Sequence, residues 1–215
     1  MTDARQQTRA EEVANSITHG LALLMSVFAL PFLIAVDARR HDPWQLAGGV
    51  IFGVSLVLLY AASTIYHALP QSRAKEIWRV LDHSAIYLVI AGTYTPFMLG
   101  ALRGPWGWSL LAAIWTLAAA GVVFKSTLGF RFPHLSTGVY LVMGWMAVVA
   151  AGPLLAHVDT TGIAWLVAGG LSYTLGVVFF AWEGLLFGHT LWHLFVAAGS
   201  TCHFVAVIGS AAGMS

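Results

Sequence analysis

Two histidines, His189 and His193, lie four residues apart in the segment GHTLWHLF. On an α-helix this spacing places both imidazoles on one face, one turn apart, where they can bind the same metal ion. The chain has nine histidines and one cysteine, Cys202, which excludes a cysteine-rich zinc site and an intramolecular disulfide. Histidine is therefore the residue type that would have to hold a zinc ion.

A third imidazole, from His67, could complete such a site. Three neutral imidazoles leave the fourth tetrahedral position of Zn²⁺ open for water, as in catalytic zinc sites. Ser63, one helical turn before His67, could hold that water, and Asp82 could accept its proton or orient a ligand. These residues are far apart in the sequence, so the fold must bring them together.

The composition indicates that the surroundings of these residues are a membrane. Hydrophobic residues make up 59% of the 215 residues and charged residues 9%, and the mean hydropathy is +0.79. Soluble domains contain about 45–50% apolar and about 25% charged residues. The formal net charge of +1 gives no reason to expect a nucleic acid partner. The sequence therefore predicts a polytopic membrane protein.

Seven segments are long enough to cross a bilayer, which takes about 20 mostly apolar residues per helix. They lie at about 17–36, 46–68, 83–101, 106–124, 136–156, 162–182 and 188–210. The polar, mixed-charge stretch at 1–16 does not have the pattern of a removable signal peptide. We therefore predict an all-α fold, a seven-transmembrane helix bundle in a single domain over 1–215, with a polar cytoplasmic N-terminal segment at 1–16.

The basic residues indicate the orientation of this bundle. With a cytoplasmic N-terminus, seven of the ten lysines and arginines lie on the cytoplasmic side. These are Arg5, Arg9, Arg73, Lys75, Arg79, Lys125 and Arg131. Cytoplasmic loops are enriched in lysine and arginine, so the N-terminus is expected inside and the C-terminus outside.

This orientation places the candidate residues at one depth. His67 ends the second span, Asp82 precedes the third, and His189 begins the seventh, all near the cytoplasmic face. His19, at the start of the first span, falls at the same level. His203 lies 14 residues beyond His189, roughly 21 Å further along a helix, and is expected outside the site.

Each of these residues also has a structural interpretation. Two histidines at this spacing can occur by coincidence, and Asp82 could cap the third helix instead of facing a metal. Ser63 could donate to the backbone of its own helix, and His203 could be a packed polar residue that bonds across helices. The shared depth of the histidines and Asp82 favours the metal site.

At these positions the chain resembles a known family, the hemolysin III proteins of bacteria within the progestin and adipoQ receptor (PAQR) family. The resemblance spans nearly the whole chain, through EEVANSITHG, STIYH, RVLDHSAIYLVIAGTYTPF and HTLWHLFVAAGSTCHF. It implies a seven-helix protein of the bacterial cytoplasmic (inner) membrane with zinc held by His67, His189 and His193. It also implies that Ser63 and Asp82 lie near the zinc-bound water. Asn15 and His19 match the N-terminal motif of the family without an assigned role.

Three functions are compatible with these features. The first is a zinc-dependent, ceramidase-like hydrolase of a lipid amide or ester, in which Asp82 takes a proton from the nucleophilic water. HTLWH lacks the glutamate of H-E-x-x-H proteases, so Asp82 is the only obvious base. The second is a non-enzymatic membrane sensor or receptor with structural zinc. The third is a haemolytic pore, for which the sequence shows neither a charged channel lining nor an amphipathic segment.

The predicted orientation can be tested with reporter fusions. A reporter fused after Ser215 is expected to be active on the outer side, and one inserted near Arg73 on the cytoplasmic side, because of the distribution of basic residues. A cytoplasmic location of the C-terminal reporter would show that one span has been miscounted.

Overall fold

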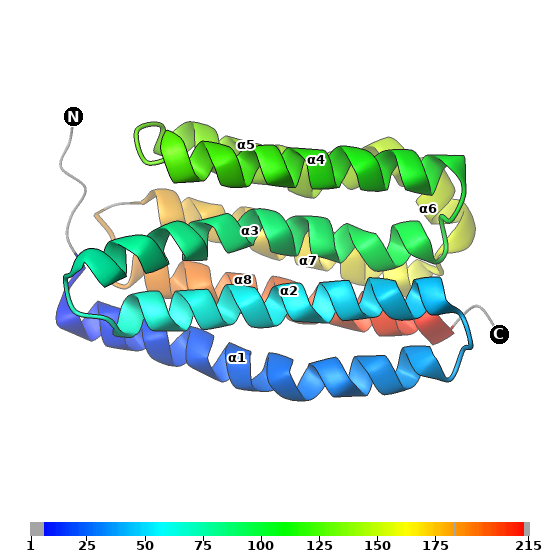
Figure 1. Cartoon of the computed structure of the whole chain (residues 1–215), viewed down its shortest axis with the longest axis horizontal. Helices are drawn as coiled ribbons and strands as arrows, with labels where there is room; N and C mark the ends of the chain where they lie inside the picture. The colour runs from blue at the N-terminus through cyan, green and yellow to red at the C-terminus, as the bar shows by residue number, and fades with distance from the viewer. Residues whose placement is uncertain (1–6, 183, 213–215) are drawn as a thin grey trace.

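Helices account for nearly all of the described residues, 7–182 and 184–212, in the computed structural model (Figure 1). The α-helices and one 3₁₀ helix are α1 (Arg9–Ala38), α2 (Pro43–Ala68), α3 (Arg73–Leu99), α4 (Pro105–Thr127), α5 (Pro133–Trp145), η1 (Met146–Ala150), α6 (Ala151–His157), α7 (Thr160–Ala181) and α8 (Gly188–Ala212). The long helices run side by side along the longest axis of the molecule (Figure 1). The predicted all-α fold is therefore confirmed.

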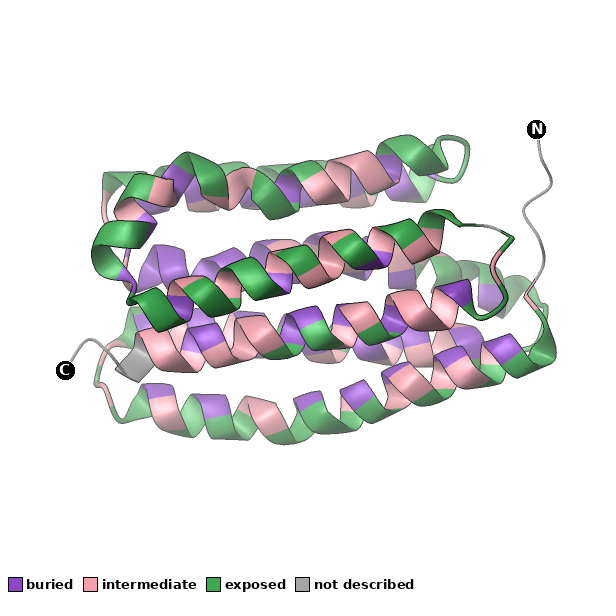
Figure 2. Ribbon diagram, turned by 180° about the vertical axis from the view of Figure 1, so that it is seen from behind, coloured by how far each residue is buried: buried purple, intermediate pink, exposed green. Residues whose placement is uncertain are grey.

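The helices also carry the lengths and composition of a membrane protein. Among the described residues, six helical stretches are long and apolar enough to cross a membrane, the stretch from Pro133 to His157 counting as one. α3 is not among them. Its N-terminal third carries several charged residues, including Arg73, Lys75 and Glu76. Buried residues follow the inward faces of the helices, while exposed residues, many of them apolar, follow the outward faces (Figure 2). The chain is a polytopic, all-helical membrane protein.

Two helices begin earlier than the hydropathy of the sequence predicts. α1 starts at Arg9, inside the segment 1–16 that we expected to be a polar extension, because Thr8 and Glu11 form a capping box. α3 starts at Arg73 and not near 83, because the Ser72 side chain accepts a hydrogen bond from the Lys75 amide. Both extra stretches are polar, and both contribute to the candidate site.

The fifth predicted segment, 136–156, is interrupted. The Tyr94 hydroxyl donates to the carbonyl oxygens of Met143 and Gly144, at 2.8 Å each, and accepts from the amide of Ala147 at 2.8 Å. A side chain inserted into the backbone hydrogen bonds of a helix disturbs its regular pattern. The chain accordingly passes from α5 through η1 into α6 at this point.

Contacts between distant helices close the bundle. α2 packs against both α1 and α3, α3 against α4, and α7 against α8, while α1 also contacts α8. At the end of the bundle where α1, α3 and α8 begin and α2 ends, the interior contains buried polar side chains. We call this end the polar end of the bundle. At the opposite end of the bundle, Arg103 donates to both carboxylate oxygens of Asp42, at 2.9 and 2.8 Å. This ion pair links the connection that precedes α4 to the connection that precedes α2.

Candidate metal centre

Three imidazoles meet at the polar end of the bundle. His67 comes from the last turn of α2, and His189 and His193 come from the first turns of α8. One ring nitrogen from each residue lies within 4.8 Å of the other two. The ring centroids are 4.6 Å apart for His189 and His193, and 5.1 and 5.0 Å from His67 to these two rings. The structure thus brings together the three histidines predicted as metal ligands.

The orientation of His67 leaves one nitrogen available at this cluster. Its Nδ1 lies 2.7 Å from Oε2 of Glu12, so the neutral ring donates Nδ1–H to the carboxylate. The Nε2 atom is buried and has no hydrogen-bond partner within the described part of the chain. A histidine that ligates a metal through one nitrogen commonly donates its other N–H to a carboxylate. His67 has the arrangement of such a ligand.

Glu12 is itself held by a buried cation. Its Oε1 atom lies 3.1 Å from Nζ of Lys75, which is 5% exposed. Nζ also donates to the carbonyl oxygens of Tyr66 and Leu69, at 2.9 and 3.0 Å, beside the end of α2. The chain of contacts from Lys75 through Glu12 to His67 therefore ties α3, α1 and α2 together. The sequence analysis did not identify Glu12 or Lys75, because both lie in the polar stretches that extend α1 and α3.

α1 also positions the start of α8. The Glu11 carboxylate accepts from the amide of Phe187 at 2.9 Å, just before α8 begins. The Asn15 side chain accepts from the Thr190 hydroxyl, and its backbone carbonyl lies 3.3 Å from Nδ1 of His193. These contacts give Asn15, whose role the sequence left open, a place beside the imidazoles.

Ser63 and His19 form a second buried contact next to the cluster. The Ser63 hydroxyl lies 2.7 Å from Nδ1 of His19, and both residues are almost completely buried. The His19 ring stacks on that of His193, with centroids 3.5 Å apart and planes 7° from parallel. Ser63 therefore connects α2 to α1 beside the imidazoles.

Asp82 lies inside α3 and not at its end. The alternative that it caps this helix is wrong, because α3 begins at Arg73 and Ser72 is its N-cap. Asp82 is 7% exposed and lines the same cavity as His189 and His193. His203 also lines this cavity but lies outside the histidine cluster, and its Nε2 is 3.3 Å from the carbonyl oxygen of Leu166 in α7. The structure agrees with the expected separation of His203 from the other histidines.

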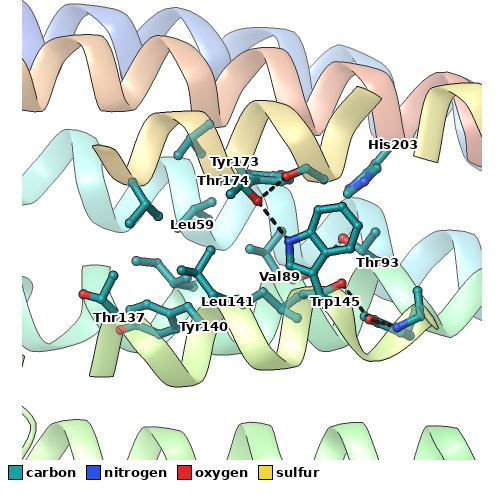
Figure 3. Close-up of a pocket in the computed structure, with 18 of the residues that line it drawn as sticks. Leu59, Val89, Thr93, Thr137, Tyr140, Leu141, Trp145, Tyr173, Thr174 and His203 are labelled. Carbon is teal, nitrogen blue, oxygen red and sulfur yellow. Dashed lines mark hydrogen bonds between the residues drawn. The ribbon is translucent and has the colours of Figure 1, made fainter. Parts of the chain in front are cut away.

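A cavity of about 450 Å³ extends from the polar end along the interior of the bundle. Its wall is largely apolar, with side chains such as Leu59, Val89 and Leu141 (Figure 3). Trp145 reaches across the cavity wall from α5, and its indole N–H donates to the Thr174 hydroxyl at 3.0 Å (Figure 3). A long apolar space with carboxylate and imidazole groups at one end matches the shape of an amphiphile.

The donor set fits a divalent metal such as zinc. Imidazole nitrogens are ligands of Zn²⁺, and a set of three with room for a fourth group is found in catalytic zinc sites. The unpartnered Nε2 of His67 supports the same assignment, because a buried polar atom without a partner is costly. His67, His189 and His193 are the residues that would hold the ion.

Comparisons with known proteins agree with these features. The family profile described as Haemolysin-III related matches residues 7–204. The chain is 46% identical to the Hemolysin-3 homolog of Bacillus subtilis (strain 168) over 201 residues, 94% of each chain. It is 46% identical to Hemolysin-3 of Bacillus cereus over 92% of this chain and 90% of the relative. It is also 28% identical to the human monocyte to macrophage differentiation factor, over 92% of this chain and 83% of the relative. The protein belongs to the haemolysin III-related family.

Proposed function

We propose that this protein is a zinc-dependent hydrolase that cleaves a lipid amide or ester inside the membrane. The observation that carries the proposal is that Asp82 and two imidazoles of the three-histidine cluster, His189 and His193, line a largely apolar cavity. An acyl chain fits the apolar wall, and the carbonyl group to be cleaved would then lie at the imidazole end. Membrane lipids are the natural source of such a ligand.

The residues of the site divide the chemistry between them. Zinc, when bound by His67, His189 and His193, supplies a Lewis acid and makes water a nucleophile at neutral pH. Asp82 accepts the proton of the attacking water. Among the described residues, it is the carboxylate that lines the cavity. The Ser63 hydroxyl, held by Nδ1 of His19, orients the water. The apolar cavity excludes bulk water from the reacting group.

The same proposal includes the number of times the chain crosses the membrane and its orientation. α3 packs against α2 and α4, and we propose that it also crosses the membrane, which brings the number of spans to seven. The chain would then form a single seven-helix domain with its N-terminus in the cytoplasm and its C-terminus outside. With its bacterial relatives in view, we assign it to the cytoplasmic membrane of a bacterium.

A receptor with structural zinc is the second candidate. The observation in its favour is that contacts at the cluster join α1, α2, α3 and α8, so a metal ion there would hold four helices together. The cavity does not favour the haemolytic pore, because its wall is largely apolar and pores that conduct ions are lined by polar groups.

The metal content provides the first test. The purified protein is expected to contain one zinc ion per chain, measured by mass spectrometry of the metal, because three imidazoles form one site. His67→Ala and His193→Ala should each lose most of it. His203→Ala is the control and should retain zinc, since its side chain contacts α7 instead. Full zinc occupancy in both ligand variants would contradict the assignment.

The role of Glu12 can be tested by metal affinity. Glu12→Gln is expected to weaken zinc binding about 10–100-fold in competition with a chelator, because His67 loses the carboxylate that orients it. The matched control is Glu76→Gln, which removes a carboxylate from the exposed side of α3 and should leave the affinity unchanged. Equal affinities of Glu12→Gln and wild type would show that this carboxylate does not support the site.

Asp82→Asn separates the hydrolase from the structural alternative. The variant should keep its fold and most of its zinc, because Asp82 is not a ligand, but lose the proton acceptor. Wild type, Asp82→Asn and His67→Ala are incubated in detergent with ceramides, acyl amides and phospholipids, and released fatty acid is measured by mass spectrometry. Zinc-dependent release by wild type that both variants lose is the expected result. Release by Asp82→Asn at the wild-type rate would refute the role of this carboxylate.

A further inference from the structure

Lys125 is a buried cation that the hydrolytic mechanism does not use. It lies near the end of α4, is 3% exposed, and lines the cavity together with Asp82. No carboxylate in the described part of the chain forms an ion pair with its ammonium group, although Asp82 attracts it from a longer distance. Ionisable groups inside a membrane protein are costly and usually serve a function. We therefore expect the buried charge of Lys125 to have a function.

A second cation lies beside it. Nζ of Lys125 is 4.3 Å from the centroid of the Phe130 ring, and Cζ of Arg79 is 4.4 Å from the same centroid. The ring stabilises each cation through its π electrons, but it does not neutralise either charge. Arg79 also has no ion pair with a carboxylate in the described residues. We call Lys125, Phe130 and Arg79 the cationic cluster.

The cationic cluster lies at the end of the cavity that holds the imidazoles. Lys125 and Phe130 line the cavity with Asp82 and His189, whereas Arg79 is exposed on α3, three residues before Asp82. A ligand whose acyl chain fills the apolar part of the cavity would place its carbonyl group near the imidazoles. Its polar part would then extend toward the cationic cluster.

We propose that the cationic cluster binds an anionic group, a carboxylate or a phosphate, on the polar part of an acyl lipid. This inference rests on the proposed function for the acyl lipid itself and narrows its class. The substrate is an amide or ester whose leaving part carries a negative charge, such as an N-acyl amino acid or a lysophosphatidic acid. Lys125 makes the charge-assisted hydrogen bond within the cavity, and Arg79 adds attraction at its entrance.

The experiment measures binding with matched pairs of ligands that differ only in charge. Native mass spectrometry of the purified, zinc-loaded protein in neutral detergent gives the affinity for N-acylglycine and for the neutral N-acylethanolamine with the same acyl chain. A second pair, lysophosphatidic acid and monoacylglycerol, tests phosphate in place of carboxylate. Wild type is expected to bind the anionic member of at least one pair about tenfold or more tightly than the neutral member. The pair that shows the larger preference identifies the anion.

Four variants connect this preference to the cluster. Lys125→Met should reduce the ratio of affinities to near one, whereas Lys125→Arg should keep it, because the positive charge remains. Arg79→Met, at an exposed position where the fold tolerates substitution, should lower the ratio by a smaller factor. Arg131→Met is the matched control, since it removes an exposed positive charge from the same end of the bundle and should not change the ratio.

These measurements test the anion site separately from the proposed hydrolase. Equal binding of charged and neutral ligands by wild type, or an unchanged preference in Lys125→Met, would overturn the inference. If Lys125→Met does not fold, an unchanged preference in Arg79→Met would overturn it as well. Because binding is measured without turnover, a charge preference that depends on Lys125 in a protein that cleaves none of the ligands would support the cationic cluster and contradict the hydrolase.

Discussion

The 2.7 Å contact between Glu12 and His67 is the interaction on which the rest of the site depends. A carboxylate in an apolar bundle is stable only if it is paired, and Glu12 is paired with His67 on one side and Lys75 on the other. The same contacts direct Nε2 of His67 toward His189 and His193 and hold α1, α2 and α3 in register. Removing one member would leave the others as unpaired polar groups in a medium that cannot hydrate them.

This constraint explains why the polar groups gather at one end of the bundle. Asn15, His19 and Ser63 each find a hydrogen-bond partner on another helix. These contacts restrict the orientation of the imidazoles, and such preorganisation is what a catalytic metal site requires. Beyond this end the interior contains a cavity lined largely by aliphatic and aromatic side chains.

The cavity and the polar end each select a different part of the ligand. The apolar wall selects an acyl chain by burial of its surface, a non-directional attraction that does not distinguish one lipid from another. The imidazoles, Asp82 and the cation of Lys125 act at defined points and only on groups of matching charge. Recognition of a particular lipid would therefore depend on the polar end, while affinity depends on the length of the cavity.

The sequence by itself determined the helical membrane fold and the imidazole pair of His189 and His193. Both depend on local patterns, namely the length of the apolar segments and the spacing of His189 and His193 on one helix. It did not determine where α1 and α3 begin, because hydropathy does not detect polar turns that are buried against other helices. Only the tertiary structure identified Glu12, Lys75 and Lys125 as neighbours of the site. Glu12 lies 55 residues from His67, and His19 lies 44 residues from Ser63, and no local pattern encodes which side chains meet across such separations.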